Sequence, residues 1–325
     1  MSTPRALITG ISGQDGSYLA ELLLDRGYEV FGIVRGSPLA HYENLTSIRS
    51  DVTLLQGDLL DQTTLLDAIS HAEPDELYNL AGTSFVPASW HQPVMTAQFT
   101  AVGVTAMLEA IRITNPAIRV YQASSSEIFG DTIESPQRET TPFHPRTPYG
   151  VAKLYGHLMV SSYRERYGMH LSSGIAFNHE SPRRPEEFVT RKITRAAAAI
   201  KLGLADQLRL GDLNAIRDWG YAGDFVEAMA QMLQRSEGDD FVLATGIGRT
   251  VGELAATAFA HVDLDAADFL VVDPKLVRPP ESIRLIGDPS KAHAQLGWMP
   301  QTSFEEMIGA MVEADLADLR ATARV

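Results

Sequence analysis

The sequence predicts a doubly wound α/β protein with a parallel central sheet and a second, smaller lobe of mixed α/β structure. Short apolar runs alternate with segments whose apolar residues recur at helical spacing. The links between these segments are short, as is usual where helices connect parallel strands. A glycine-rich turn follows the first apolar run directly, which is typical of a Rossmann-type fold.

The expected elements of the first lobe alternate along the chain. The runs expected to form buried strands are residues 5–10, 29–36, 52–58, 75–82, 118–125 and 169–179. The expected helices are residues 15–28, 61–74, 93–116 and 147–168. Continuous apolar strands indicate a sheet that is covered on both faces. Because crossovers are right-handed, a Rossmann-type strand order is the natural arrangement.

The regular alternation ends near residue 178, where proline, arginine and glycine become frequent. We expect residues 1–178 to form a first domain and residues 179–325 to form mainly the second lobe. Residues 219–246 combine a helical and a strand-like pattern, and we expect them to return to the first domain. An amphipathic helix is expected at residues 302–320.

Composition narrows the classes of function. The formal net charge is −14 over 325 residues, which disfavours nucleic acid and anionic membrane surfaces as partners. The chain has no cysteine, which excludes disulfides and thiolate chemistry, and no metal site is predicted. No signal peptide is recognised at the start, and no apolar run is expected to reach the roughly 20 residues of a membrane-spanning helix. We therefore expect a cytoplasmic protein.

The glycine-rich turn predicts a dinucleotide site. Gly10, Gly13 and Gly16 stand between the first strand and the first helix, where glycines permit a tight turn and a close approach of backbone to a pyrophosphate. The amino terminus of the following helix adds unpaired N–H groups. The alternative is a glycine-rich turn without a ligand. The position of the glycine-rich turn directly after the first strand favours the dinucleotide site. Residues 1–178 are therefore predicted to be a dinucleotide-binding domain.

The end of the second strand favours NADP over NAD. An acid there commonly binds the ribose 2′-hydroxyl of NAD, whereas an arginine can bind the 2′-phosphate of NADP. The sequence offers Arg35 and no acid; the alternative is a solvated surface arginine. Asp58, at the end of the third strand, could bind the adenine amino group or cap the following helix, and the sequence leaves both open.

Tyr149 and Lys153 are spaced to lie on one face of a helix. Thr147 is a plausible N-cap, and Pro148 suits the first helical position. An ammonium beside a phenol lowers the pKa of the tyrosine, and a cationic nicotinamide nearby acts in the same direction. The pair is therefore predicted to be a catalytic base for an alcohol, with a structural pair as the alternative.

Three serines and a glutamate, Ser124 to Glu127, follow the fifth strand, at the edge where open α/β sheets bind ligands. One hydroxyl is enough to orient an alcohol, so Glu127 suggests a second proton transfer. A sugar oxidised at C4 has an acidic C5 proton, whose removal permits loss of water from C5 and C6. The residues Ser125, Ser126 and Glu127 with the Tyr–Lys pair form a minimal set for that 4,6-dehydration. Alternatively, Glu127 caps a turn or pairs with an arginine.

The chain resembles the GDP-mannose 4,6-dehydratases of the extended short-chain dehydrogenase/reductase superfamily. The resemblance covers nearly the whole chain and lies in the motifs "ALITGISGQDGSYLAELLL", "YQASSSEIFG", "TPYGVAKLYG", "FNHESPRR", "FVTRKITRA", "IRDWGYAGDFVEAM" and "IGDPSKAHAQLGW". It implies a lyase that uses a tightly bound, recycled NADP to convert GDP-mannose into GDP-4-keto-6-deoxymannose. It also implies that the second lobe binds the sugar nucleotide. Alternatives are another sugar-nucleotide dehydratase, epimerase or reductase of the superfamily, acting on a UDP-, dTDP- or CDP-sugar, or a non-catalytic NADP-binding regulator.

The predicted site residues combine these motifs with the resemblance. The predicted cofactor residues are Gly10, Ile11, Ser12, Gly13, Gln14, Asp15, Gly16, Arg35, Asp58, Leu59, Leu80, Ala81, Gly82, Ser84, Tyr149, Lys153, His179 and Arg184. The predicted substrate residues are Ser84, Asn178, Thr190, Lys192, Arg217, Arg278 and Glu281. The loop after Arg35 is shorter than in long family members, where it helps to build a tetramer, so a homodimer is expected and a homotetramer remains possible.

Overall fold

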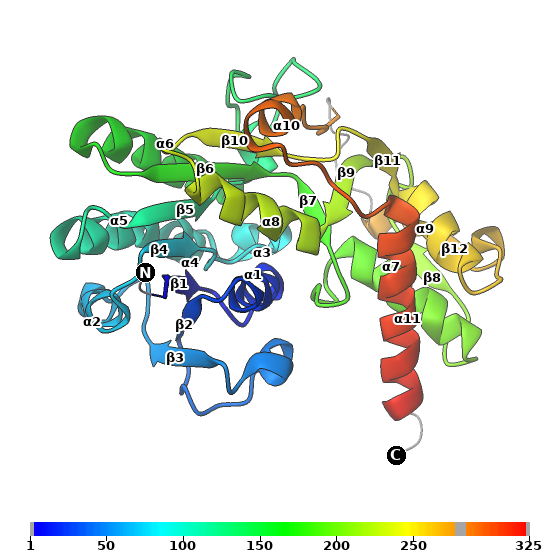
Figure 1. Ribbon diagram of the computed structural model, residues 1–325. Coiled ribbons are helices and arrows are strands. Elements are labelled where there is room, and N and C mark those ends of the chain that lie inside the picture. Colours follow the sequence, from blue (N-terminus) through cyan, green and yellow to red (C-terminus); the bar gives the residue numbers. More distant parts are fainter. Residues whose placement is uncertain (1–2, 277–283, 323–325) are drawn as a thin grey trace.

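The computed structural model describes residues 3–276 and 284–322, and its largest unit is a seven-stranded sheet (Figure 1). The strand order is β10-β6-β5-β4-β1-β2-β3, and every neighbouring pair is parallel. The strands are β1 (Arg5–Thr9), β2 (Glu29–Val34), β3 (Val52–Gln56), β4 (Glu76–Asn79), β5 (Arg119–Ala123), β6 (Leu171–Ala176) and β10 (Asp240–Leu243). The predicted Rossmann-type, doubly wound sheet is confirmed.

Helices cover both faces of this sheet. One face carries α1 (Gln14–Asp25), α8 (Ala222–Leu233) and α10 (Ser290–Leu296), and the other carries α2 (Gln62–Ala72), α5 (Gly103–Thr114) and α6 (Pro148–Tyr167) (Figure 1). Each face has its own apolar cluster, in which strand residues such as Ile8 and Leu7 pack against the helices of that face. Burial of these aliphatic and aromatic side chains is the main stabilising contribution of this lobe.

The expected helix over residues 93–116 is built from three pieces. They are α4 (Pro93–Ala97), a π-helical turn η2 (Gln98–Val102) and α5, and the shorter α3 (Val86–His91) precedes them. By length and composition alone the stretch Pro93–Thr114 could cross a membrane, although half of it is buried inside the protein. The expectation that no apolar stretch reaches that length was therefore wrong. Met107, Leu108 and Ile111 pack in the apolar core of the first lobe.

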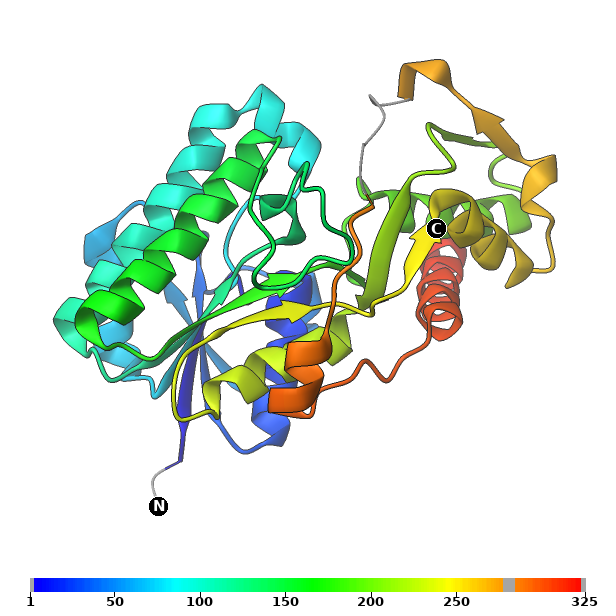
Figure 2. The ribbon, with the colours of Figure 1, turned by 90° about the horizontal axis from the view of Figure 1, so that it is seen from above.

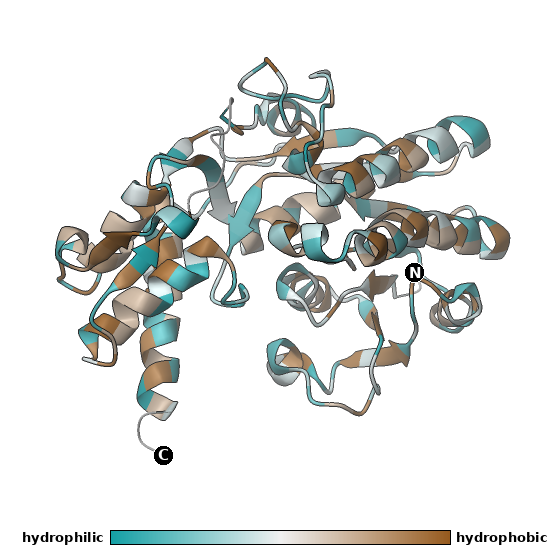
Figure 3. Ribbon diagram, turned by 180° about the vertical axis from the view of Figure 1, so that it is seen from behind, coloured by the Kyte–Doolittle hydropathy of each residue, from teal (hydrophilic) through white to brown (hydrophobic). Residues whose placement is uncertain are grey.

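The second lobe lies beside the first and has its own core (Figure 2). Its strands are β7 (Asn178–Glu180), β9 (Ile216–Tyr221) and β11 (Gly248–Thr250) in one sheet, and β8 (Leu208–Leu210) and β12 (Leu270–Val272) in another. Its helices are α7 (Val189–Lys201), α9 (Val251–Ala260) and α11 (Phe304–Thr322). Figure 3 shows the alternating apolar and polar bands of α11, whose apolar side contributes Met307, Met311 and Leu316 to this core. Short helical turns occur at η1 (Glu43–Ile48), η3 (Ser126–Ile128), η4 (Ala266–Asp268) and η5 (Pro274–Leu276).

The chain passes between the lobes repeatedly. The expected single strand over residues 169–179 is two strands, because the chain leaves the large sheet after β6 and enters the small sheet as β7. It returns to the first lobe at α8 and joins the large sheet as β10. The chain then passes through the second lobe again before α10, which packs against both α8 and β10. Which lobe binds which ligand stays a prediction.

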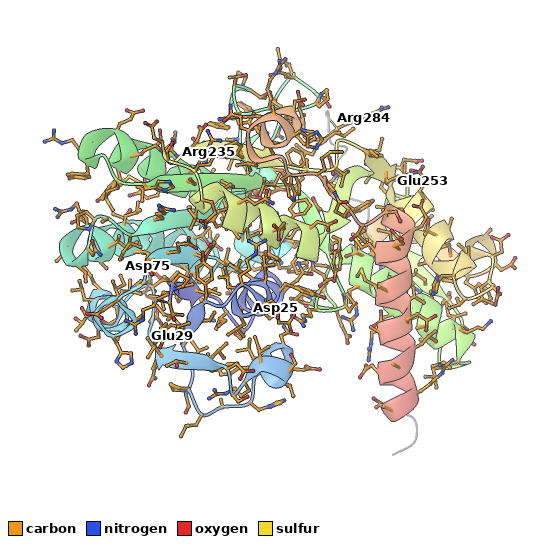
Figure 4. All side chains as sticks on the ribbon, viewed as in Figure 1. Asp25, Glu29, Asp75, Arg235, Glu253 and Arg284 are labelled. Atoms are coloured by element: carbon orange, nitrogen blue, oxygen red, sulfur yellow. The ribbon has the colours of Figure 1, made fainter. Side chains whose placement is uncertain are left out.

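The two edges of the large sheet differ in chemistry. At the amino edge, Arg5 forms an ion pair with Glu29 at 3.0 Å, and its backbone N–H donates to Asp75 at 2.9 Å. Figure 4 labels Glu29 and Asp75 there. The charged groups of the amino edge therefore pair with one another, whereas the carboxyl edge opens into a cavity.

Candidate active site

A cavity of about 450 Å³ lies at the carboxyl edge of the large sheet. Its walls come from the segments that follow β1, β2, β3, β4, β5 and β6, together with residues of β7 and the loop before α7. Open α/β sheets bind ligands at this edge. The size suits a small-molecule or cofactor site.

The glycine turn forms one wall of the cavity. Gly10 has φ of +72°, a conformation that favours glycine. A Cβ on Gly16 would lie 2.3 Å from the carbonyl oxygen of Gly10, so helix α1 can pack this closely only with glycine at that position. Gly13 is the N-cap of α1, and no side chain among the residues that the structure describes caps this helix end. Its first N–H groups and the helix dipole are therefore suited to an anion such as a pyrophosphate.

Asp15 and His179 join this wall to the second lobe. His179 Nε2 lies 2.9 Å from a carboxylate oxygen of Asp15, and Nδ1 lies 2.7 Å from the carbonyl oxygen of Phe177. A carbonyl and an ionised carboxylate only accept hydrogen bonds, so both contacts are satisfied when His179 is an imidazolium. Burial alone would lower the pKa of His179, but Asp15 raises it above the usual value. Burial alone would raise the pKa of Asp15, but the charge and hydrogen bond of His179 lower it to about 2.

The far end of the cavity lies where β2 and β3 end. Ile33, Val34, Arg35, Gly57 and Leu59 line it. Arg35 is exposed, and its guanidinium carbon lies 5.2 Å from the centre of the Phe99 ring. No acidic residue follows β2 in the sequence at this point.

Asp58 does not line this cavity. Its carboxylate accepts a hydrogen bond from the N–H of Leu60 at 2.9 Å. The N-cap of α2 is Asp61, which accepts from the N–H groups of Thr63 and Thr64. The sequence alternative in which Asp58 caps that helix is therefore wrong.

The serine–glutamate segment turns sharply after β5 into the short helical turn η3. Ser125 is extended, and its hydroxyl accepts a hydrogen bond from the N–H of Glu127 at 3.2 Å. The start of α6 packs tightly on this turn, since a Cβ on Gly150 would lie 2.6 Å from the carbonyl oxygen of Glu127. Ser124 is buried, and its hydroxyl has no hydrogen-bond partner among the described residues. The segment thus places Ser124, Ser125, Ser126 and Glu127 in the cavity lining.

Tyr149 and Lys153 lie on α6 as predicted, and both line the cavity. Thr147 is the N-cap of the helix, and its side chain accepts from the N–H of Gly150. The Ser125 hydroxyl lies beside the Tyr149 hydroxyl and lowers its pKa, and Lys153 Nζ donates to the carbonyl oxygen of Ala123 at 2.8 Å. Lys153 Nζ lies 5.7 Å from the centre of the Tyr149 ring. These contacts bring the Tyr–Lys pair and the serine–glutamate segment together.

The pKa of Tyr149 differs from the sequence expectation. Burial raises it well above its usual value, and the Glu127 charge adds to that increase, while the Ser125 hydrogen bond opposes it. Burial also lowers the pKa of Lys153 to about 8. The expected lowering of the tyrosine pKa is therefore not produced by the protein groups alone. It requires a further positive charge, such as that of an oxidised nicotinamide, close to the phenol.

The residues predicted in the second lobe are only partly in the cavity. Asn178 and Arg184 line it. Thr190 is buried and donates to Glu180 at 2.5 Å, and Arg184 pairs with the same carboxylate at 3.0 Å. Lys192 is exposed and donates to the carbonyl oxygen of Arg209 at 2.7 Å.

Of the remaining predicted substrate residues, Ser84 lines the cavity. Arg217, on β9, is not part of that lining, and its guanidinium donates to the carbonyl oxygen of Ile216 at 2.8 Å. Arg278 and Glu281 lie outside the described residues. The substrate roles of the residues in this lobe stay predictions.

Most predicted site residues meet in the one cavity. Those in its lining are Gly10, Ser12, Gly13, Gln14, Asp15, Gly16, Arg35, Leu59, Leu80, Ala81, Gly82, Ser84, Ser125, Ser126, Glu127, Tyr149, Lys153, Asn178, His179 and Arg184. Ile11 is fully buried in the core, and it lies behind the turn rather than in the lining.

Several lining residues were not among the predicted site residues, although Ser124 was expected at this edge: Thr9, Ile33, Val34, Gly57, Thr83, Val86, Phe99, Tyr121, Ala123, Ser124, Ala176, Phe177, Pro185, Phe188 and Met229. Thr9, Val34, Ala123 and Ala176 occupy the last positions of their strands. The rule that ligands bind at the carboxyl edge could have found them. Phe99 and Met229 lie within helical segments and carry no such local signal.

A doubly wound sheet with a glycine turn and a Tyr-x-x-x-Lys pair at its carboxyl edge defines the class of extended short-chain dehydrogenase/reductases. The family model described as GDP-mannose 4,6 dehydratase matches residues 7–311. The curated protein "GDP-mannose 4,6 dehydratase 1" of Arabidopsis thaliana is 48% identical, with 96% of this chain and 89% of that protein covered. The chain belongs to the GDP-mannose 4,6-dehydratase family.

Solved structures share the fold. UDP-glucose 4-epimerase of Thermus thermophilus, solved with NAD, is 27% identical with a TM-score of 0.83, and 96% of this chain and 98% of that chain are covered. The RMD protein of Pseudomonas aeruginosa, solved with NADPH, is 24% identical with a TM-score of 0.81, and 97% and 99% are covered.

Proposed function

We propose that this protein converts GDP-mannose into GDP-4-keto-6-deoxymannose and water, using NADP that is tightly bound and regenerated in each turnover. The observation that carries the proposal is the meeting of Tyr149, Ser125 and Glu127 in one cavity beside the glycine turn. A plain alcohol dehydrogenase needs the first two of these groups, whereas loss of water needs a further acid or base. Family membership and the curated relatives support the same reaction.

The residues present fit a nicotinamide dinucleotide. Glycine at position 16 lets α1 begin directly against the turn at Gly10, so the amino terminus of this helix lies at the cavity, where its N–H groups suit a pyrophosphate. Leu80, Ala81 and Gly82 line the stretch of cavity after β4. Arg35 at the end of β2, where no acid stands, supports NADP over NAD. When bound, the nicotinamide supplies the acceptor and later the donor of a hydride.

The residues of the chain divide the proton transfers between them. Tyr149 takes the proton of the C4 hydroxyl as C4 loses its hydride, and the Ser125 hydroxyl, which lies beside Tyr149, orients the same oxygen by a hydrogen bond to it. Lys153 holds a positive charge close to the phenol, which favours the phenolate. Glu127 removes the C5 proton made acidic by the new C4 ketone. The C6 hydroxyl leaves as water with one proton, and C6 receives the hydride while C5 is reprotonated.

Substrate turnover tests the proposal directly. Purified protein with NADP and GDP-mannose should yield a sugar nucleotide lighter by one water, with no net accumulation of NADPH. UDP-glucose, dTDP-glucose and CDP-glucose serve as matched competitors. Turnover of one of these competitors in place of GDP-mannose would refute the substrate assignment, and accumulation of NADPH would refute the dehydratase cycle.

We also propose a homodimer that forms through the exposed faces of α5 and α6. Apolar side chains on these neighbouring helices are unusually exposed: Val102 next to α5 by 55%, and Val151 and Leu158 on α6 by 55% and 50%. Burial of such a surface in a dimer is favourable. Sedimentation should give twice the mass of one chain, and Leu158→Glu should give the monomer. Four times that mass would instead indicate a tetramer.

A cytoplasmic location remains a prediction of the sequence.

A further inference from the structure

The π-helical turn η2 brings an aromatic ring to the far end of the cavity. The turn spans Gln98–Val102 between α4 and α5, and Phe99 within it lines the cavity. Single π-turns inside α-helices frequently occur at functional sites, because the inserted residue changes where neighbouring side chains point. Helical periodicity in the sequence does not predict this placement, and Phe99 takes no part in the proton transfers of the proposed reaction.

The helix that carries Phe99 is held firmly against this end of the cavity. A Cβ on Gly103, directly after the turn, would lie 3.0 Å from Cβ of Leu59, which itself lines the cavity. Phe99 is partly buried and packs on the apolar cluster that contains Ile33 and Leu59. Its ring is therefore a fixed surface rather than a freely rotating side chain.

Arg35 rests on that ring. The 5.2 Å between its guanidinium carbon and the ring centre is within the range of a cation–π contact. In residues 3–276 and 284–322, the Arg35 side chain has neither a hydrogen bond nor an ion pair within the protein. The contact with the ring occupies none of the guanidinium N–H donors, so all of them stay available for an anion.

We propose that Phe99 positions the Arg35 guanidinium for the 2′-phosphate of NADP and thereby contributes to the preference for NADP over NAD. This inference rests on the NADP assignment proposed above. A long arginine side chain loses rotational freedom when it binds a phosphate, and a ring that already restricts it reduces that loss. Because NAD has no 2′-phosphate, Phe99 should have little effect on the affinity for NAD. Phe99 is thus a positioning residue that acts through Arg35.

The test measures dissociation constants of NADP and NAD for the purified full chain, in the wild type, Phe99→Leu, Phe99→Trp and Arg35→Ser. Phe99→Leu should weaken the binding of NADP roughly two- to five-fold, which is the range expected for a cation–π contact at an exposed site. The binding of NAD should not change. Phe99→Trp should retain the wild-type preference, because the indole also attracts a guanidinium. In the Arg35→Ser background, Phe99→Leu should have no further effect on the ratio of the two constants.

The outcomes separate this inference from the cofactor assignment. If Phe99→Leu weakens NADP and NAD equally, Phe99 only supports the fold and the inference is overturned. The same conclusion follows if Arg35→Ser removes the preference while Phe99→Leu keeps it. If the wild type binds NAD as tightly as NADP, the NADP assignment fails and this inference fails with it, while turnover of GDP-mannose with NAD would still uphold the dehydratase reaction.

Discussion

The two lobes differ in how their predicted site residues are engaged. In the first lobe, Glu127, Tyr149 and Lys153 reach the cavity from segments that follow or flank one strand, β5, and form what we call the first wall of the cavity. In the second lobe, Thr190 and Lys192 have hydrogen bonds to other parts of their own lobe and do not line the cavity. The first wall is arranged for chemistry on a small molecule, whereas Thr190 and Lys192 hold the second lobe together.

Tyr149→Phe should have the largest effect, because it removes the proton acceptor from the first wall. Loss of general acid–base catalysis lowers turnover by up to about 10⁴-fold, while cofactor affinity should stay within about two-fold of the wild type. Stopped-flow absorbance of the reduced nicotinamide and a binding titration measure both quantities. Tyr167→Phe, on the exposed end of the same helix, is the matched control. Near-normal turnover in Tyr149→Phe would mean that the first wall does not carry the chemistry.

Glu127→Gln tests whether the same wall performs a second proton transfer. Turnover should fall roughly 10²–10³-fold, since the amide is not a base, but cofactor should bind normally. In heavy water the wild type should place deuterium at C5, and the variant should not, which mass spectrometry of the sugar nucleotide measures. Glu187→Gln in the exposed loop before α7 controls for loss of charge. Deuterium at C5 at the wild-type rate in Glu127→Gln would exclude this residue as the base.

Thr190→Val examines the second lobe. The valine leaves the buried Glu180 carboxylate without one hydrogen bond, so the free energy of unfolding should fall by about 1–3 kcal/mol. The KM for GDP-mannose should change less than about three-fold, and urea unfolding with initial-rate kinetics separates the two quantities. A large rise in KM with unchanged stability would instead show that Thr190 contacts substrate, as the family resemblance implies.

The Asp15–His179 pair joins the two lobes. His179→Gln should have the smallest effect on stability, and this effect should depend on pH. The pKa of His179 is raised from 6.5 in the folded protein. The pair therefore stabilises the fold fully below pH 6.5, and this contribution is lost as the pH rises through the raised pKa. His179 also stacks on Phe225, whose ring centre is 4.7 Å away. The stability that the variant loses with this stacking should not depend on pH.

The stability difference between the wild type and His179→Gln should accordingly shrink between pH 6 and pH 9 in urea unfolding. His41→Gln, in an exposed loop, should give a difference that does not change over this range. Parallel stability curves for the wild type and His179→Gln would show that His179 is not charged in the folded protein.

The sequence predicted the first wall well because the residues concerned stand next to the strand ends that place them. Gly10, Glu127 and Tyr149 are each within a few residues of a strand or a helix start, so alternation and sheet topology are enough to bring them together. The register of the helix at Phe99 was not predictable, since a π-turn leaves no trace in apolar periodicity. Residues 169–179 formed one apolar pattern, and only the formation of a second sheet divides them into β6 and β7.

The interleaved path of the chain has a consequence for engineering. Neither lobe is one continuous stretch of sequence, because α8, β10 and α10 interrupt the second lobe and belong with the first. The second lobe of a relative cannot be grafted here as one continuous segment, and a truncation after β6 would remove β10, an edge strand of the large sheet. Changes to the second lobe are therefore made by substitution in place, in a chain that crosses between the lobes repeatedly.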